Sequence, residues 1–357
     1  MIGAGVVGVA TAWLLLRQGH RVQLLDPCLQ GPQTAPSGSR AALGVLMAQV
    51  FHRSSGRAWR LRQRSLELWQ QWIALLEAQG HSLPRRQGVL LLASSSEDWE
   101  RQQRLVAERQ RQGIPLELWS VEQLEALQPL LPGPSVGALY SPNDGQIDPG
   151  PVIEALLASS RLEGLQTRAD RAVALQRQGC GWLVSCEQGS PIAADWLVIT
   201  AGVGSHTLVE DLGHPIAMEP VLGQALELAL PAMGSASDTW QQWPGVVVWQ
   251  GVNLVPKPMA NGVARLWLGA TLETSAEVDP AELANLRHLH GHAPPWLLEA
   301  SVERSWQGVR PHPLGQPAPV LKALEPTLLL ASGHYRNGVL LAPASAEWVS
   351  GQITSIR

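Results

Sequence analysis

Residues 1–26 read MIGAGVVGVATAWLLLRQGHRVQLLD, and this stretch decides the fold of the chain. It opens with GAGVVG at Gly3–Gly8, a G-x-G-x-x-G pattern. The apolar run that follows predicts a helix over Val9–Gln18, and Arg21–Asp26 predicts a short strand that ends in an acid. In such a turn the first glycine permits a tight bend, the second lets backbone approach a pyrophosphate, and the third lets the helix pack closely on a sheet. The stretch is therefore typical of an α/β domain that binds a dinucleotide.

The acid at the end of this unit strengthens the interpretation. Asp26 lies 18 residues after Gly8, where a carboxylate accepts hydrogen bonds from a ribose hydroxyl. The N-terminus of the helix offers unpaired N–H groups and the positive end of a dipole to phosphates. An acid at this position argues against a 2′-phosphate, and hence against NADP. The alternative is a glycine-rich helix entry that binds nothing. The residues predicted to hold the dinucleotide here are Gly3, Gly5, Val6, Val7, Gly8 and Asp26.

The strand that should precede the glycine turn is short in this sequence. Only Met1 and Ile2 come before Gly3, whereas a strand usually has about five or six residues. We therefore expect the native gene to encode a few more residues, rich in Val and Ile, before Met1. An in-frame stop codon directly before Met1 would contradict this expectation.

Two later segments also run from a strand into a glycine-rich turn. The strand Asp195–Thr200 (DWLVIT) leads directly into an Ala-Gly pair. The strand Thr327–Ala331 leads into SGHYRNG at 332–338, and an apolar helix is expected over Gly338–Ile353. Small residues at such turns let the backbone lie close to a flat cofactor. We expect both turns to face the same site as the first one.

The middle of the chain has a different pattern. Residues 220–270 are mostly strand-like, Val302–Val309 is a further strand, and Asp144–Pro149 (DGQIDP) is expected to be a turn before a helix. Helix and strand alternate at both ends. This predicts an α/β fold in which a Rossmann-like domain is interrupted by a substrate domain of antiparallel β-sheet plus helices. The predicted bounds are 1–83, 141–215 and 309–357 for the dinucleotide-binding domain, and 84–140 and 216–308 for the substrate domain.

Composition excludes several other classes of protein. The chain has 357 residues, 45% of them hydrophobic, so it can bury a core and is not a disordered protein. Its net charge of -4 argues against a nucleic-acid binder. The longest apolar stretch, Ile2–Leu16, is shorter than the roughly 20 residues of a membrane span, and no basic segment precedes it as in a signal peptide.

Cysteine and histidine usage argues against disulfides and metals. The three cysteines, Cys28, Cys180 and Cys186, form neither a disulfide framework nor a zinc-binding spacing, which favours a reducing cytoplasm. His288 and His292 share a helix face, but no acid or cysteine accompanies them. We therefore expect no metal site.

The motifs together resemble the D-amino-acid oxidase superfamily of FAD-dependent amine oxidases, and the chain is most similar to the glycine oxidases of thiamine biosynthesis. The resemblance covers nearly the whole chain. Besides Gly3–Gly8 with Asp26, it rests on Ser37–Gly44, Asp144–Pro149, Thr200–Gly202 and Gly308–Pro311, and above all on GHYRNGVLLAP at Gly333–Pro343. The last segment matches the glycine-oxidase motif nearly residue for residue and separates the chain from NAD dehydrogenases.

The resemblance implies further cofactor residues. They lie in the Ser37–Gly44 loop and the two later turns, and they are Ser39, Arg40, Ala41, Gly44, Thr200, Ala201, Gly202, Gly333, His334, Tyr335, Arg336, Asn337 and Gly338. Sarcosine oxidases of the superfamily attach their flavin through a cysteine in the C-terminal half. No cysteine follows Cys186, so FAD is expected to bind non-covalently.

The resemblance also implies which residues meet the substrate. A planar guanidinium holds a carboxylate through two parallel hydrogen bonds, and arginines matching Arg310 and Arg336 are associated with the substrate carboxylate in the family. We expect Arg310 to be the main clamp. At the position of a substrate-contacting tyrosine this chain has Asn253, whose amide could donate to the carboxylate. The shorter side chain could admit a larger amino acid or N-methylglycine.

The expected activity is oxidation of glycine or another small zwitterionic amino acid to the imino acid. Reduced flavin would be reoxidised by O2 with release of H2O2, and the product would supply the thiazole branch of thiamine biosynthesis. One alternative is a dehydrogenase for D-amino acids or secondary amines that passes electrons to a carrier. Another is a truncated inactive relic or a binding module. The family suggests a homotetramer.

Overall fold

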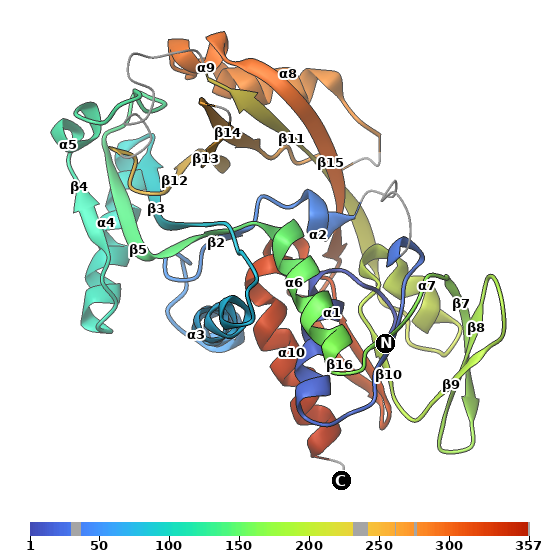
Figure 1. Ribbon diagram of the computed structural model, residues 1–357. Helices are drawn as coiled ribbons and strands as arrows, with labels where there is room; N and C mark the ends of the chain where they lie inside the picture. The colour runs from blue at the N-terminus through green and yellow to red at the C-terminus, as the bar shows by residue number, and fades with distance from the viewer. Residues whose placement is uncertain (30–36, 231–241, 261, 275–276, 356–357) are drawn as a thin grey trace.

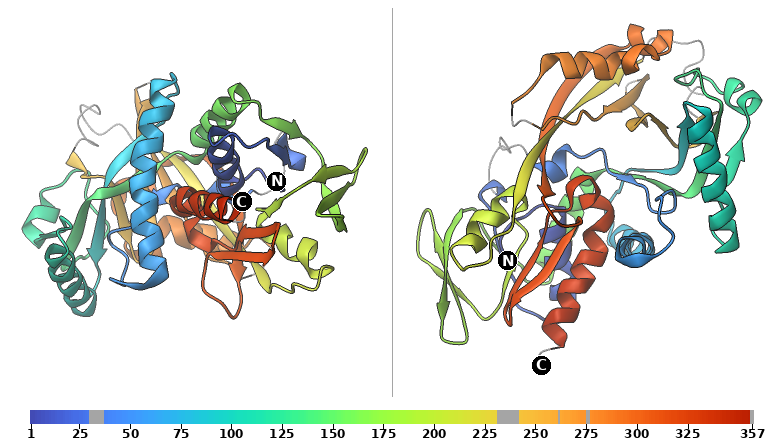
Figure 2. Two further views of the ribbon diagram at one scale, coloured as in Figure 1. Left: turned by 90° about the horizontal axis from the view of Figure 1, so that it is seen from below. Right: turned by 180° about the vertical axis from the view of Figure 1, so that it is seen from behind.

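The computed structural model describes residues 1–29, 37–230, 242–260, 262–274 and 277–355. Figure 1 shows the two ends of the chain together in its lower half, around helices α1 (Val6–Arg17) and α10 (Gly338–Thr354). The middle of the chain forms a curved sheet above them. The views of Figure 2 show the same division from below and from behind.

The lower half is built on a mostly parallel sheet. In spatial order its strands are β16 (Val320–Glu325), β17 (Leu328–Ser332), β10 (Leu197–Ile199), β1 (Gln23–Leu25) and β6 (Gln166–Arg168), with Ile2 between β10 and β1. All neighbours are parallel except β16 and β17. Parallel strands joined through helices are typical of a dinucleotide-binding fold.

Residues 1–3 occupy the central position of this sheet. The N–H of Ile2 donates to Val198 O at 3.0 Å, and the N–H of Gly3 donates to Leu25 O at 2.9 Å. In return, Leu25 N donates to Met1 O at 2.9 Å. These bonds join the two flanking strands into one sheet through a very short segment.

Four helices pack around the sheet and each other. Helix α1 contacts α10 and α6 (Pro149–Leu162), and α10 also contacts α3 (Gly56–Ala78). Their apolar faces share one core cluster with strands β10 and β17. Helix α1 begins at Val6, three residues before the start expected from the sequence, so the glycine turn itself contributes the first helical turn.

The upper half is a nine-stranded sheet. Its order is β15 (Ser301–Pro313), β11 (Met218–Ala229), β14 (Val263–Gly269), β13 (Val252–Ala260), β12 (Val246–Trp249), β3 (Arg85–Ala93), β5 (Gly137–Ile147) and β2 (Val45–Leu46), with β4 (Glu117–Trp119) paired to β5. The pairs are antiparallel except for β12 with β3, so the predicted antiparallel sheet contains one parallel pair.

Short helices and a hairpin surround these two sheets. The remaining helices are α2 (Gly38–Ala41), α4 (Ser96–Arg111), α5 (Val121–Glu125), α7 (Ser205–Glu210), α8 (Pro280–His288) and α9 (Pro295–Glu299). A third sheet consists of β7 (Ala172–Gln178), β8 (Gly181–Cys186) and β9 (Ile192–Ala194). Helices α8 and α9 contribute to a second core cluster against β12–β14.

The structure confirms the predicted fold class and corrects one detail. The segment Asp144–Pro149 was expected to be a turn, but residues 144–147 continue strand β5. Gly145 pairs with Gln87 of β3, and a Cβ at Gly145 would lie 2.4 Å from Arg86 O. The glycine therefore allows close approach of a neighbouring strand rather than a reversal of the chain. Within the described residues, no helix is both long and apolar enough to cross a membrane.

Candidate functional site

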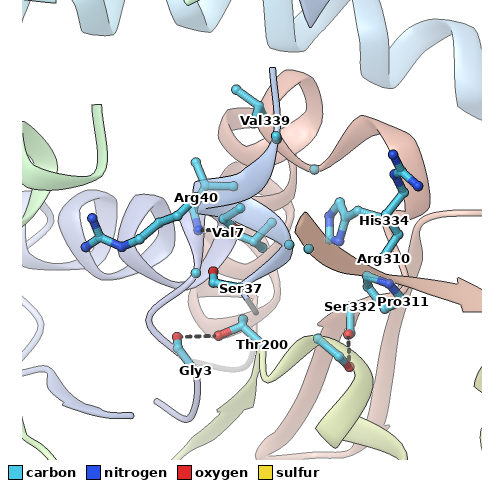
Figure 3. Close-up of a pocket in the computed structure, with 18 of the residues that line it drawn as sticks. Gly3, Val7, Ser37, Arg40, Thr200, Arg310, Pro311, Ser332, His334 and Val339 are labelled. Atoms are coloured by element: carbon cyan, nitrogen blue, oxygen red, sulfur yellow. Dashed lines mark hydrogen bonds between the residues drawn. The ribbon is translucent and has the colours of Figure 1, made fainter. Parts of the chain in front are cut away.

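A cavity of 1110 Å³ lies where the two halves meet (Figure 3). Small-molecule pockets span roughly 300–1,000 Å³, so there is room for a dinucleotide together with a small substrate. Predicted cofactor residues on its wall are Gly3, Gly5, Val6, Val7, Asp26, Ser39, Arg40, Ala41, Gly44, Thr200, Ala201, Gly202, His334, Tyr335, Arg336, Asn337 and Gly338. The predicted substrate residues Asn253, Arg310 and Arg336 also line it. Segments far apart in sequence thus meet at one cavity.

The first glycine turn is shaped by contacts that exclude side chains. Gly3 has φ +105°, and a Cβ there would lie 2.5 Å from Thr200 O. A Cβ at Gly8 would lie 1.9 Å from Gly3 O. Gly8 does not line the cavity, so its role in the structure is to let α1 begin directly against the turn. Gly5 lines the cavity and precedes the first residue of α1, next to Ser39.

Asp26 is held by the turn that it faces. Its Oδ2 accepts from Ala4 N at 2.7 Å, and its Oδ1 accepts from Cys28 N at 2.8 Å. Each carboxylate oxygen has a second lone pair, so Asp26 can still accept from a ribose hydroxyl at the end of β1. Ser39 Oγ accepts from Val6 N at 3.0 Å, which ties α2 to the N-terminus of α1.

The end of strand β10 forms a second wall of the cavity. Thr200 Oγ1 lies 2.9 Å from the carbonyl oxygens of both Ile2 and Gly3. Figure 3 shows the contact with Gly3. Gly202 has φ +58°, and no atom lies within 4 Å of where its Cβ would be. Glycine here keeps open space at the cavity wall. Ser332 Oγ donates to Gly202 O at 3.0 Å and so joins the end of β17 to this turn.

The segment Gly333–Gly338 forms the third wall. Gly333 has φ +63° and faces away from the cavity, where a Cβ would lie 2.9 Å from Val320 Cγ2. His334 is 4% exposed, and its Nε2 lies 2.8 Å from Ser345 Oγ. Burial lowers the pKa of His334 to about 3, with a further contribution from Arg57, so its ring stays neutral at ordinary pH. Tyr335 has φ +52°, an uncommon conformation for a residue with a side chain, and its ring packs on His312 at 4.4 Å between centroids.

The N-terminus of α10 follows this segment. The 17-residue helix α10 begins at Gly338, and the 12-residue helix α1 begins at Val6 on the same cavity. Two helix N-termini therefore direct their positive ends at one space. Together with Asp26 and the cavity volume, this arrangement fits FAD, whose pyrophosphate needs N–H donors and whose adenosine ribose needs an acceptor.

The Ser37–Gly44 loop, which contains the short helix α2, completes the cavity wall with Arg40, Ala41 and Gly44. Trp306 Nε1 donates to Ala41 O at 2.9 Å. Gly44 has φ +75°, and a Cβ there would lie 1.9 Å from Ile147 O. Arg40 forms a surface ion pair with Glu154 at 2.7 Å and lies across the view of Figure 3 from Arg310 and His334.

Arg310 is a half-buried cation on the cavity wall. Its Nη1 donates to Leu222 O at 3.0 Å and to Thr271 O at 3.1 Å. These bonds fix the guanidinium while leaving Nη2 and Nε for another acceptor. Burial lowers the pKa of Arg310, and the charge of Arg336 acts in the same direction. A guanidinium nevertheless stays charged in proteins, so two cations near each other favour an anion between or beside them.

Arg336 and Asn253 are the other two predicted substrate residues on the cavity wall. Arg336 is exposed, and its Nη2 donates to Gly251 O at 3.4 Å. Asn253 lies on β13, and its Nδ2 donates to Gly269 O at 3.2 Å. One N–H of the amide that is expected to donate to a substrate carboxylate is therefore bonded to the protein, and the amide has a second N–H.

The sequence interpretation missed one residue that shapes this site. A Cβ at Gly223 of β11 would lie 2.0 Å from Nη2 of Arg310. The signal was an isolated glycine inside the strand-like run GQALEL, which is typical of close approach by another group.

No metal site accompanies these residues in the part of the chain that the structure describes, because no group of three or more His, Cys, Asp or Glu side chains there could hold an ion. Nδ1 of His288 lies 2.8 Å from Ala284 O, and Nδ1 of His292 lies 3.2 Å from Gly133 O.

Comparisons with known proteins agree with the geometry. The chain is 26% identical to glycine oxidase of Geobacillus kaustophilus (strain HTA426) over 98% of this chain and 91% of that protein. It is 25% identical to glycine oxidase of Bacillus subtilis (strain 168), over 99% and 92%. The crystal structure of glycine oxidase from Geobacillus kaustophilus superposes with a TM-score of 0.85 at 25% identity, covering 99% of this chain and 93% of that one.

The family assignment confirms the predicted cofactor, FAD, and the predicted class of enzyme. The family model described as DAO, FAD dependent oxidoreductase, matches residues 1–352, nearly the whole chain. With three glycine-rich walls, two helix N-termini and Asp26 around one cavity, the chain belongs to the DAO family of FAD dependent oxidoreductases.

Proposed function

We propose that this enzyme oxidises glycine or another small amino acid to the imino acid. The observation that carries the proposal is the position of Arg310, a fixed and half-buried guanidinium on the same cavity as the dinucleotide-binding turns. The similarity to glycine oxidases over nearly the whole chain supports the choice of substrate.

Arg310 would bind and orient the substrate carboxylate. Its Nη1 is bonded to the carbonyls of Leu222 and Thr271, so the remaining donors form the planar pair that matches a carboxylate. Arg336 would add a second positive charge from the exposed side. Holding the carboxylate fixes the α-carbon in space, which removes most of the orientational cost of the reaction.

In the reaction the α-carbon loses a hydride and the nitrogen loses a proton, so that a C–H bond breaks and a C=N bond forms. The chemistry that bound FAD would supply is acceptance of the hydride and transfer of two electrons to O2, which would take up two protons to give H2O2. The neutral, buried His334 adds no charge to the flavin-facing wall. The residues supply binding, position and electrostatics.

Several further properties belong to this proposal. The roles of all named cofactor and substrate residues, non-covalent FAD, a cytoplasmic location, a homotetramer and a place in the thiazole branch of thiamine biosynthesis are supported by the resemblance to glycine oxidases. The domain bounds 1–83, 141–215 and 309–357, with 84–140 and 216–308, are supported by two separate core clusters, one around α1 and α10 and one against β12–β14.

The experiment that tests the proposal is a substrate panel on FAD-loaded protein. Glycine, sarcosine and D-alanine are each supplied under air, and H2O2 is measured. Peroxide in proportion to substrate consumed supports an oxidase. Reduction of the flavin without peroxide, with turnover restored by a quinone, would indicate a dehydrogenase instead. A chain that stays colourless after attempted loading would contradict the proposal altogether.

A further inference from the structure

Arg62 is another buried guanidinium on the cavity wall. It lies on α3, is 7% exposed and lines the cavity. The centre of its guanidinium lies 3.8 Å from the centroid of the Phe51 ring, which attracts a cation but does not neutralise its charge. Burial lowers the pKa of Arg62, and no carboxylate among the described residues opposes this shift. A buried charge is costly unless it is paired, so this position favours an anion that comes from outside the described residues.

Most of the donors of Arg62 are unused. Nη1 donates to Ala58 O at 3.1 Å, one turn earlier in the helix. Nε is enclosed by protein and has no partner, so a ligand cannot reach it. Nη2 also has no partner among the described residues, but it is not one of the enclosed atoms. Because a guanidinium only donates, the terminal N–H groups of Arg62 are available to an acceptor in the cavity.

The surroundings of Arg62 on the cavity wall are mostly apolar. We call this part of the cavity the Arg62 lobe, and its wall consists of Met47, Val50, Phe51, His52, Arg62 and Leu91. Burial and the charges of Arg53 and Arg62 lower the pKa of His52, so cations rather than acids act on this lobe. Asp144 accepts N–H bonds from the backbone of residues 48–50 but does not line the cavity. The lobe therefore suits an apolar segment that ends in an anion.

A row of paired residues across the large sheet connects the Arg62 lobe to the proposed substrate site. Leu91 of β3 pairs with Val248 of β12, and Val248 pairs with Asn253 of β13. Residues directly opposite each other on neighbouring strands project from the same face of a sheet, and two strand spacings are about 10 Å. Leu91 and Asn253 both line the cavity. Asn253 is bonded to Gly269 O, two residues before the carbonyl that accepts from Arg310. The lobe therefore belongs to the substrate end of the cavity.

A ligand that reaches both guanidinium groups needs an anion at each end. Arg310 offers donors to one carboxylate, and Arg62 offers donors to another beyond the apolar side chains of the lobe. Glycine has no group that could extend into the lobe. Aspartate and glutamate carry a second carboxylate on one or two methylene groups, so they match the two cations and the apolar wall between them.

We propose that Arg62 binds a second carboxylate of the substrate, so that the enzyme prefers amino acids with an acidic side chain to neutral amino acids of the same length. This inference rests on the proposed function, because it names a substrate class for the same cavity. Arg62 is then a specificity-determining residue, and Arg310 keeps its role at the α-carboxylate.

The binding test uses carboxylates that lack an amino group and so are not oxidised. Succinate is compared with butyrate, and glutarate with pentanoate, by titrating FAD-loaded protein and following flavin absorbance. The members of each pair have the same number of carbons and differ in the second carboxylate. In the wild type at least one dicarboxylate should bind roughly 10- to 100-fold more tightly than its partner, the contribution of a hydrogen bond to a charged group. Equal affinities within both pairs would overturn the proposal.

Two variants on α3 identify the residue responsible. Arg62→Met keeps an unbranched side chain beside Phe51 but removes the charge, so it should abolish the preference for dicarboxylates and leave butyrate binding unchanged. Arg60→Met is the matched control, because Arg60 is an exposed arginine of the same helix, and its preference should equal that of the wild type. Equal weakening of succinate and butyrate in Arg62→Met, or an unchanged preference, would refute the assignment.

A further variant keeps the test decisive if Arg62→Met does not take up FAD. Arg62→Gln also removes the charge but leaves a polar side chain, and the same two outcomes apply to it. Anaerobic flavin reduction is then measured with glycine and with aspartate, asparagine, glutamate and glutamine in both enantiomers. At least one acid should half-saturate the reduction at a lower concentration than its amide. Flavin that no amino acid reduces would contradict the proposed function, whereas reduction without a preference for acids would contradict the role of Arg62 alone.

Discussion

Nη2 of Arg310 occupies the space that a Cβ on residue 223 would need, at 2.0 Å from that position. Gly223 on β11 therefore determines where the guanidinium of Arg310, on β15, can lie. The two strands are paired in a register that places Val221 opposite Arg310 and Gly223 opposite Gly308. The position of the Arg310 guanidinium is thus set by strand pairing and by the absence of one side chain.

Gly223→Ala should displace the guanidinium without removing it. The added methyl group would push Nη2 away, so at least one charged hydrogen bond to a carboxylate should be lost, weakening acetate binding by roughly tenfold or more. Acetate binding to FAD-loaded protein measures the effect. Gly150→Ala is the matched control, because no atom lies within 4 Å of its Cβ position. Unchanged acetate affinity in Gly223→Ala would show that Arg310 does not hold the carboxylate.

Arg310→Ala removes the guanidinium that is proposed to bind the substrate carboxylate. Carboxylate binding should weaken by several kcal/mol, because a charged hydrogen-bond donor is lost from a half-buried site, while FAD content should remain nearly unchanged. Flavin absorbance gives the FAD content, and acetate titration gives the affinity. Loss of FAD with unchanged acetate affinity would reverse the assignment and place Arg310 at the cofactor.

Buried His334 should make stability depend on pH. Its pKa is about 3 in the folded state, below the ordinary value of 6.5, so the unfolded chain binds a proton that the folded chain does not. The stabilising contribution is complete above pH 6.5 and is lost as pH falls toward 3, at up to about 1.4 kcal/mol per pH unit. Urea unfolding with saturating FAD at pH 7.5 and pH 5.0 measures the loss. In His334→Gln the free energies of unfolding at pH 7.5 and pH 5.0 should lie closer together than in the wild type. An equal loss of stability between the two pH values in both proteins would contradict this.

A buried ion pair joins the two halves near the cavity. Lys257 of β13 contacts Asp148, which precedes α6, and lies over the ring of Trp267 at 3.7 Å. Burial lowers the pKa of Lys257, while Asp148 opposes that shift. Asp148→Asn would leave the lysine charge without its partner, which costs about 3–5 kcal/mol.

Urea unfolding gives the loss in free energy of unfolding for Asp148→Asn and for a control variant at a surface ion pair. Glu347→Gln breaks the pair with Arg64, whose side chain is 43% exposed, and should cost less than about 1 kcal/mol. If the free energy of unfolding falls by a similar amount in both variants, the Lys257–Asp148 pair contributes no more to stability than a surface ion pair does.

Local patterns were sufficient to predict which turns meet at the cavity. The turns at Gly3–Gly8, Thr200–Gly202 and Gly333–Gly338 each follow a strand and can be identified within a few residues of sequence. Arg310 was singled out through the family resemblance, and it lies within β15 rather than at the end of the strand predicted over Val302–Val309. The assignment to a FAD-dependent family and the α/β fold followed from these motifs and are confirmed by the family match over residues 1–352.

Features that depend on distant pairing could not be predicted. Asp144 looked like the start of a turn, but its carboxylate accepts N–H bonds from Ala48, Gln49 and Val50, residues distant in sequence. The contact between Gly223 and the guanidinium of Arg310 depends on the register of β11 with β15. The hydrophobic pattern of one strand restricts which of its faces is buried, but it does not identify the distant strand that pairs with it.

The central claim is that this cavity brings an amino acid to FAD with its carboxylate on Arg310. The most direct measurement is anaerobic mixing of glycine, sarcosine or D-alanine with FAD-loaded protein while flavin absorbance is followed. The account predicts bleaching of the flavin by at least one of them, and bleaching in Arg310→Ala only at far higher substrate concentration. Flavin that stays oxidised with every amino acid, or bleaching that is equally efficient in Arg310→Ala, would contradict it.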